Sequence, residues 1–562
     1  MTRAVSPCYP MSSCFNALKR CALKRVSKRG SLAAQAMGQW MERKEKQKDE
    51  EKEMGIKLVL LVIFFAIMVG VGIYSRRHTA SVDGFVLGGR SVGPWLTAFA
   101  YGTSYFSAVV FVGYAGQFGW KYGIASTWIG IGNAVLGSLL AWVVLGRRTK
   151  VMTQHLGSRT MPDFFGQRYD SKALKVTASV IVFVFLIPYT ASVYNGLSRL
   201  FEMAFNIPYT WCVIVMAAFT AIYVILGGYM ATAINDFIQG IIMLIGIVAV
   251  VAAVLSGQGG FMNAISEMSQ IPSDVAVTQG QPGAFTSFFG PDPINLLGVV
   301  ILTSLGTWGL PQMIGKFYAI KDEKSINTGT VISTLFAVVV SGGCYFLGGF
   351  GRLFDGPEIY DKATGAVVYD SIIPHMLSAL PDILIGIVVV LVLSASMSTL
   401  SSLVLTSSST LTLDLLKDNV MKNMTEKKQI ITMQALIVFF IVISVVIALD
   451  PPTFIAQLMG ISWGALAGAF LAPFLYGLYW KGVTRAGVWA GFIAGVGLTV
   501  SNMFIGYIES PINAGAAAMV AGLIVVPVVS LITPKLKKEK VQEVFECYEE
   551  KVTITKKHSL QE

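Results

Sequence analysis

Hydroxyl side chains gather in one apolar stretch of this sequence, residues 391–414, LVLSASMSTLSSLVLTSSSTLTLD. At about 100° per residue on a helix, seven of them share one face: Ser394, Ser398, Ser401, Ser402, Ser408, Ser409 and Thr412. The stretch ends an apolar run that is long enough to cross a bilayer. Small, hard cations prefer oxygen ligands, so this face could bind such a cation at membrane depth. The alternative is helix packing, because small side chains let membrane helices approach closely.

Two further apolar stretches carry helix-breaking residues. Residues 93–118 contain Gly102, and residues 294–318 contain Gly309 and Pro311, of which the proline lacks an amide donor. Counted along the chain, these are spans 2 and 7, so each opens a set of five spans. An odd number of spans inverts the second set, which is typical of inverted-repeat transporters with their binding site at the breaks. Carbonyls freed there are tolerated only where they line a cavity or bind an ion.

Asp236 stands near the start of the apolar span 234–255. A carboxylate inside a membrane span is costly and often functional. Asp is also a common N-cap residue, and a helix start at the interface would explain it equally well. The sequence leaves both interpretations open: an N-cap, or a cation ligand or vestibule charge.

Composition sets the class of protein to which these elements belong. The 562 residues are 54% hydrophobic and 13% charged, with a mean hydropathy of +0.64. These values are typical of a polytopic membrane protein. Windows of about 20 apolar residues predict thirteen spans: 55–75, 93–118, 125–146, 173–198, 208–226, 234–255, 294–318, 327–350, 381–413, 429–449, 453–477, 484–506 and 512–533. We therefore expect an all-α polytopic membrane protein with about 13 transmembrane helices.

The distribution of charge predicts the orientation. Loops at alternate span ends are basic, whereas the long loop 256–293 has acidic residues and no Lys or Arg. By the positive-inside rule, the C-terminus is cytoplasmic and the first span starts outside. The net charge of +11 does not indicate nucleic-acid binding, because about half of it lies in residues 1–53 and most of the rest in short loops. The six cysteines and four histidines follow no disulfide or zinc spacing, so we expect no cofactor.

Residues 1–53 differ chemically from everything that follows. They are polar and basic and lack the apolar core of a signal peptide, so we expect a disordered or non-native N-terminal extension. Met54 precedes the first span almost directly and is an alternative start of the protein. Export of a basic leader would oppose the positive-inside rule, which favours that alternative.

Over about residues 55–533 the chain resembles the sodium:solute symporter family. The motifs that carry the resemblance are GGRSVGPWLTA, TMPDFFGQRYDS, LGGYMATAINDFIQG, GLPQMIGKFYAIKD, SASMSTLSSLVLTSSSTLTLDLL and GLYWKGVTRAG. The resemblance implies a LeuT-type core of 5+5 inverted repeats. It predicts a peripheral helix 1 (54–75), repeat 1 (90–255, helices 2–6), repeat 2 (293–477, helices 7–11), helices 12–13 (484–533) and a cytoplasmic tail (534–562).

The resemblance also implies site residues. Its common sodium site places here the carbonyls of Thr103, Phe106 and Ala395 and the hydroxyls of Ser398 and Thr399. Some members have a second sodium site, and the matching residues are Ser107, Asp236, Ser401 and Ser402. Candidates for the substrate pocket are Tyr105, Ser107, Trp128 and Thr307, none of them charged. Proline symporters carry an aspartate where this chain has Tyr105, and YFSA is closer to the pantothenate type.

These residues predict a secondary active transporter, not an enzyme. It would carry Na⁺ and a small organic solute, such as an amino acid, a pantothenate-like vitamin or another small carboxylate, across the cell membrane into the cell by alternating access. The sequence lacks GxxxxGK[ST], which argues against an ATP-driven pump, and its GxSxG match at 460–464 lies inside a membrane span. Alternatives are a proton-coupled carrier with Asp236 as the proton site, or a transporter-fold sensor, for which the tail is too short to hold a signalling domain.

Overall fold

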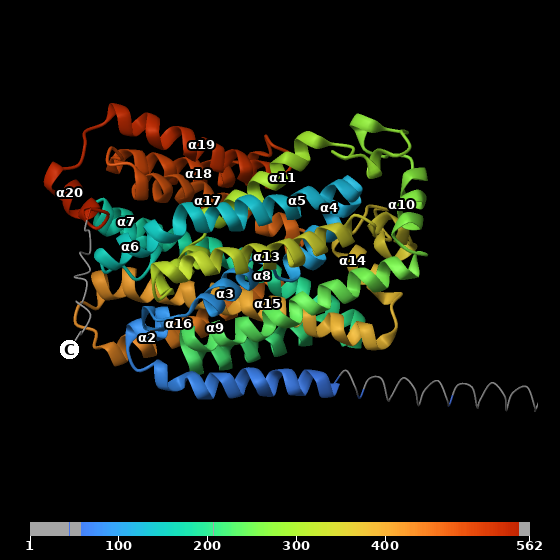
Figure 1. The fold of residues 1–562 in the computed structure, drawn as a ribbon, viewed down its shortest axis with the longest axis horizontal. Coiled ribbons are helices and arrows are strands. Elements are labelled where there is room, and N and C mark those ends of the chain that lie inside the picture. The colour runs from blue at the N-terminus through green and yellow to red at the C-terminus, as the bar shows by residue number, and fades with distance from the viewer. Residues whose placement is uncertain (1–43, 45–54, 56–57, 206, 550–562) are drawn as a thin grey trace, which may run out of the picture. The chain divides into compact units, whose positions relative to one another are not determined.

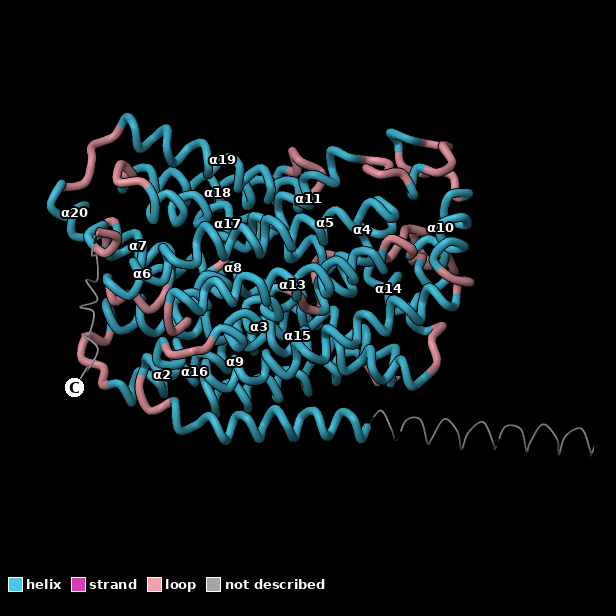
Figure 2. The backbone as a smooth tube through the Cα atoms, viewed as in Figure 1, coloured by secondary structure: helices cyan, strands magenta, loops and turns pink. Residues whose placement is uncertain are grey.

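The computed structural model describes residues 44, 55, 58–205 and 207–549. The expectations for residues 1–53 other than Lys44, for Met54 as a start and for the tail beyond residue 549 lie outside these ranges. The chain divides into two compact units, Met1–Leu61 and Val62–Glu562, and only the second is described at length. The elements described in it are helices connected by loops (Figures 1 and 2). Two isolated β-bridges occur among these loops.

Among the described residues, eleven helices are long and apolar enough to cross a membrane. Their bounds are Leu58–Ser75, Val109–His155, Lys172–Phe205, Tyr209–Gly257, Pro293–Ala319, Glu323–Gly348, Ile383–Val420, Glu426–Leu449, Ile455–Tyr479, Arg485–Ile505 and Pro511–Ile532. Two of these have 47 and 49 residues, which at about 1.5 Å per residue is more than twice the thickness of the hydrocarbon core. Each is divided by a glycine with positive φ, Gly123 (φ 59°) and Gly228 (φ 54°). With both divided, the described helices give thirteen candidate crossings, the number predicted from the sequence.

Ten of these crossings form two sets of five. In the first set, the first crossing consists of α3 (Pro94–Tyr105), η3 (Val109–Tyr114) and α4 (Ala115–Tyr122). The second runs from α5 (Thr127–Gly132) through η5 (Asn133–Leu140) and η6 (Trp142–Gly146) to α6 (Arg147–His155). The third is α8 (Lys172–Phe205), and the fourth and fifth are the two halves of α9 (Tyr209–Gly257). In the second set, the first crossing consists of α11 (Pro293–Leu305), η9 (Gly306–Trp308) and α12 (Pro311–Ala319). The second is α13 (Glu323–Gly348), and the third is α15 (Asp382–Thr410) with η12 (Leu411–Val420). The fourth is α16 (Glu426–Leu449), and the fifth is α17 (Ile455–Tyr479).

The two sets pack on each other reciprocally. The third member of the second set, α15, packs against α9, which contains the fifth crossing of the first set. In the same way α8, the third member of the first set, packs against α17, the fifth of the second. This exchange is what two repeats of opposite topology produce around a shared centre. The broken helix α3 lies between α9 and α13, at the middle of the bundle (Figure 1).

The remaining helices cover one flank and the two ends of the bundle. Helices α18 (Arg485–Ile505) and α19 (Pro511–Ile532) pack on α17 and on each other, and α20 (Lys538–Glu546) packs on α6 (Figure 1). The short helices α2 (Val82–Leu87) and α7 (Met161–Arg168) lie at the end near α20, and α10 (Phe261–Gln270) and α14 (Tyr369–Ser378) at the opposite end (Figure 1).

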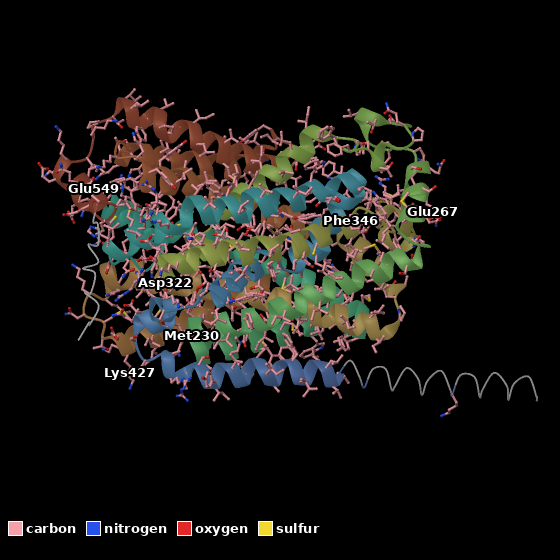
Figure 3. All side chains as sticks on the ribbon, viewed as in Figure 1. Met230, Glu267, Asp322, Phe346, Lys427 and Glu549 are labelled. Carbon is pink, nitrogen blue, oxygen red and sulfur yellow. The ribbon has the colours of Figure 1, made fainter. Side chains whose placement is uncertain are left out.

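The basic loops share one end of the bundle. Ion pairs join them to one another across the sequence: Arg147–Glu323, Arg159–Asp83, Lys175–Asp418 and Arg485–Asp170. In Figure 3, Asp322, Lys427 and Glu549 lie toward this end, whereas Glu267, in the loop without Lys or Arg, lies toward the other. The charge asymmetry that the sequence predicts between the two faces is therefore present in the fold.

Glycines set the closest helix contacts. A Cβ on Gly119 of α4 would overlap the carbonyl oxygen of Gly348 at the end of α13, and a Cβ on Gly348 would overlap the carbonyl of Ala115. The two backbones therefore touch directly, as small residues allow in membrane bundles. Gly342, on the same helix α13, has open space at its Cβ position.

We predict that Gly119→Ala destabilises the fold by about 1–3 kcal/mol, because the added methyl group must push two backbones apart. Gly342→Ala is the matched control and should leave stability unchanged or slightly raised, since alanine favours helix over glycine. The measurement is the thermal unfolding midpoint of each purified variant in detergent. Equal midpoints for the two variants would contradict the direct backbone contact between α4 and α13.

Candidate functional site

The first helix break lies four residues later than the sequence predicts. The expected break at Gly102 is wrong, because α3 runs through Gly102 and ends at Tyr105, and Phe106 is extended (φ −103°, ψ 115°). The reason for a glycine at 102 is packing, because a Cβ there would overlap the ring of Phe336 on α13. The unwound segment is therefore Phe106–Ser107, since Ala108 already has helical angles (φ −53°, ψ −28°) and the chain continues as η3.

The backbone groups released by this break find partners in hydroxyl side chains, mostly from α15. The Ala108 amide donates to Ser396 Oγ (3.2 Å), and the Val109 amide to Ser107 Oγ (3.2 Å). The Thr103 carbonyl accepts from Ser398 Oγ (3.0 Å) and Thr399 Oγ1 (3.2 Å). Unpaired backbone groups are costly in a membrane, so these contacts stabilise the break and fix α3 against α15.

Four of the five oxygens predicted for the main sodium site form one cluster. Besides the Thr103 carbonyl, Ser398 Oγ and Thr399 Oγ1 both contact the Ala395 carbonyl, at 2.9 and 3.1 Å. The fifth, the Phe106 carbonyl, sits in the unwound segment and accepts no backbone hydrogen bond from the described residues. All of these residues are buried. Carbonyls and hydroxyls supply lone pairs without net charge, so the donor set suits a hard monovalent cation.

The second break is where the sequence places it. Gly309 separates η9 from α12, and Pro311 is the first residue of α12, where a missing amide costs nothing. A Cβ on Gly309 would lie 2.8 Å from Ala467 Cα of α17, so this position also needs a small residue. Thr307 Oγ1 donates to the carbonyl of Gly137 (3.0 Å), which joins the second break to η5.

Tyr105 connects the two broken helices. Its hydroxyl donates to the Thr303 carbonyl of α11 (2.5 Å), and its ring stacks on Trp463 of α17 with centroids 5.7 Å apart. Tyr189 of α8 packs edge-on against the same indole, at 5.9 Å. The Tyr189 hydroxyl and Trp463 Nε1 are buried beside one another, and the Tyr189 hydroxyl also faces Ser107, so polar atoms accompany these aromatic rings.

Trp128 is not brought to this group. Its Nε1 donates to the Phe288 carbonyl (2.8 Å), and its ring packs on Phe288 and Phe289 in the loop before α11. Nine residues separate it from Gly137, about 13 Å along a helix. Tyr105 and Thr307 both lie at Gly137, because Thr307 donates to its carbonyl and the Tyr105 hydroxyl would lie 3.6 Å from a Cβ there. Trp128 instead packs on the loop before α11.

The residues matched to a second sodium site are distributed differently. Asp236 is fully buried in the interior of α9, eight residues past the bend at Gly228, so it is not a helix N-cap. Its Oδ2 lies 3.6 Å from Lys316 Nζ of α12, and that ammonium donates to Ser402 Oγ (3.0 Å). Ser401 instead donates to the Ser398 carbonyl, and Ser107 accepts from Val109. Asp236 and Ser402 therefore converge on Lys316, while Ser107 and Ser401 bond elsewhere.

Sequence reasoning misses three residues at this centre: Ser396, Trp463 and Lys316. Ser396 belongs to the hydroxyl-rich stretch but lies outside its main arc, and Trp463 has no sequence signal beyond its apolar helix. Lys316 resembles the lysines of the basic loops, although its place five residues after Pro311 puts it on a buried helix.

Comparisons with known proteins give the family. A profile of the Sodium:solute symporter family matches residues 85–495. The sodium/proline symporters of Staphylococcus aureus strains JH9 and NCTC 8325 / PS 47 are each 30% identical over 497 residues, covering 86% of this chain and 93% of the relative.

A solved structure of a Na⁺-coupled sialic acid symporter, substrate-bound and outward-open, has a TM-score of 0.71 at 14% identity, covering 86% of this chain and 98% of that chain. At that identity the likeness concerns the fold, and it confirms the predicted multi-span LeuT-type architecture. The matched profile, the sequence relatives and the fold agree, and the chain belongs to the Sodium:solute symporter family, as a multi-pass membrane protein that couples solute transport to Na⁺ and is not an enzyme.

Proposed function

We propose that this protein binds one Na⁺ between the break of α3 and the hydroxyl face of α15 and moves a small organic solute with it into the cell. The ligands would be the carbonyls of Thr103, Phe106 and Ala395 and the hydroxyls of Ser398 and Thr399. The observation that carries the proposal is the oxygen cluster, in which four of these atoms lie within 3.2 Å of a neighbour in the set. A cation there would draw on lone pairs from both helices at once.

The ion would act by fixing α3 to α15. With the ion bound, the Thr103 carbonyl of α3 and the Phe106 carbonyl of the unwound segment would share one partner, which would order the segment beside Tyr105. A charge that crosses 100 mV gains about 2.3 kcal/mol, and a tenfold sodium gradient adds about 1.4 kcal/mol. One Na⁺ could therefore support accumulation of a solute without net charge, such as a zwitterionic amino acid, by several hundredfold.

The solute would bind beside the ion, between Tyr105, Trp463 and Thr307. No side chain named in this group is charged, and the aromatic rings of Tyr105 and Trp463 give it apolar walls. The bound Na⁺ would then supply a positive charge for a solute carboxylate. We therefore propose a small carboxylate-bearing solute, such as an amino acid or a pantothenate-like vitamin. The relatives named for proline transport make an amino acid the first compound to test.

The orientation follows the charge asymmetry. The end that carries the basic loops and α20 would face the cytoplasm, and the end that carries α10 and α14 would face outside. Sodium then enters from the side of α10 and α14, and the inward-open state releases it at the side of α2 and α7. The protein would lie in the cell membrane with its C-terminal tail inside.

A proton-coupled carrier is the second candidate, because Asp236 and Lys316 are buried side by side within the membrane. Uptake of a labelled metabolite panel into proteoliposomes separates the two. An imposed Na⁺ gradient should drive uptake at constant pH on both sides. Uptake driven by a pH gradient without Na⁺ would overturn the sodium proposal.

We predict that Ser398→Ala combined with Thr399→Ala raises the Na⁺ concentration for half-maximal uptake by tenfold or more. Each hydroxyl contributes about 1 kcal/mol or more as a ligand, and 1.4 kcal/mol is a factor of ten. The measurement is initial uptake against Na⁺ concentration at fixed ionic strength.

The matched control is Ser407→Ala, on the same helix, since the Ser407 hydroxyl is buried without a hydrogen-bond partner among the described residues. It should keep the sodium dependence of the unmodified protein. An unchanged sodium requirement in the double variant would remove Ser398 and Thr399 from the site.

We predict that Tyr105→Phe raises the KM for the transported solute by about fivefold at saturating Na⁺, because it breaks the hydrogen bond to Thr303, worth about 1 kcal/mol. Trp128→Phe should leave KM within twofold, since Trp128 packs on a loop away from this group. The reverse ranking of the two variants would place the solute near Trp128 instead.

A further inference from the structure

Lys316 is a buried cation within a membrane-spanning helix. Its side chain is 3% exposed, and it lies on α12, five residues after the proline that opens that helix. An ammonium group at this depth is costly unless charged and polar groups surround it. The groups in contact with the Lys316 ammonium therefore indicate what kind of site this is.

Three groups surround the ammonium. Lys316 Nζ donates to Ser402 Oγ (3.0 Å), lies 3.6 Å from Asp236 Oδ2 and lies over the ring of Tyr229, 5.3 Å from its centroid. Ser402 Oγ in turn is hydrogen bonded to Ser104 Oγ of α3 (2.8 Å). A carboxylate, hydroxyls and an aromatic face are groups that attract a cation. The ammonium thus lies where α3, α9, α12 and α15 converge.

Two of these groups, Asp236 and Ser402, are among those for which the family resemblance implies a second sodium site. We propose that the ammonium of Lys316 occupies this second cation position as a tethered cation, so that the protein binds one sodium ion and not two. The inference rests on the proposed function and specifies its ion stoichiometry. Lys316 neutralises Asp236, and a second free cation beside the ammonium would be strongly repelled in the low-dielectric interior.

The surroundings of Lys316 leave room for an ion once the side chain is shortened. Lys316 and Ser402 line a cavity of about 40 Å³ together with Tyr229, Thr406 and Ser409. A cavity of that size has room for a few water molecules, or for an ion with part of its hydration shell. Removal of the ammonium would therefore expose the Asp236 carboxylate and the hydroxyls of Ser402 and Ser104 to a free cation.

Sodium itself is the probe for the test. Equilibrium binding of radioactive sodium to the purified full-length protein, without solute, should give one site for the unmodified protein. Lys316→Ala should give two sites. Lys316→Arg, which keeps the cation, and Lys316→Ala combined with Asp236→Asn, which removes both charges, should each give one.

A second set of variants assigns the sites. Ser398→Ala with Thr399→Ala should weaken the single sodium site of the otherwise unmodified protein by tenfold or more, yet leave one site outside this weakened one when Lys316→Ala is added. Two sites in the unmodified protein, or one site in a folded Lys316→Ala variant, would overturn the inference. If Lys316→Ala does not fold, the count for the unmodified protein decides: one site supports the tethered cation, and two sites exclude it.

Failure of the proposed function gives a different result. A protein that binds no sodium, before or after substitution of Lys316, refutes the sodium site itself. A protein that binds two sodium ions keeps the proposed function and loses only the role of Lys316 as a tethered cation.

Discussion

The unpaired backbone of a broken helix inside a membrane is the constraint on which this structure depends. The hydrocarbon core of a bilayer offers no hydrogen-bond partners, so the amides and carbonyls released at the break need partners within the protein. Helix α15 supplies them: Ser396 accepts from the Ala108 amide, and Ser398 and Thr399 donate to the Thr103 carbonyl. The first role of the hydroxyl face of α15 is therefore to form hydrogen bonds with the backbone groups that the break releases. The same pairing leaves oxygen atoms from two helices facing one another, which is the geometry that a cation requires.

The reciprocal packing of the two sets of five helices holds these groups in place. Because α15 packs on α9 and α17 on α8, each break is framed by helices of both sets. Close contact depends on glycines, at Gly102 against Phe336 and at Gly309 against α17. Tyr105 then joins the two breaks through the Thr303 carbonyl. This hydrogen bond is a direct contact between the two broken helices.

Much of this arrangement could be predicted from the sequence. Hydropathy predicts thirteen crossings, and the spacing of helix breakers identifies the two opening helices of the repeats. The hydroxyl arc and the family motifs together point to Thr103, Ala395, Ser398 and Thr399, which the fold gathers into one cluster. The crossings and the hydroxyl arc can be predicted because periodicity and bilayer thickness act locally along the chain. The choice of Thr103, Ala395 and Thr399 comes from the family resemblance, and their role as ligands stays a prediction.

Other features depend on tertiary contacts that no local pattern carries. Glycine is a helix-breaking residue type, but Gly102 lies within α3. Its missing side chain makes room for the ring of Phe336. Asp236 resembles an N-cap only if its helix starts nearby, whereas α9 continues through that point from the bend at Gly228. Lys316 belongs with the basic loops by composition, and only the fold places it against Asp236. Trp128 is aromatic and lies within a span, yet it packs on the loop before α11.

Sodium binding between the unwound segment of α3 and the hydroxyl face of α15 is the central claim. Hydrogen–deuterium exchange of the purified protein tests it directly, because exchange reports the opening of individual backbone segments. Replacing K⁺ by Na⁺ at constant ionic strength should slow exchange in the peptides that cover residues 103–110 and 394–402, with no comparable change in α18 and α19. Equal exchange of the 103–110 peptides in the two salts would contradict sodium binding at the break.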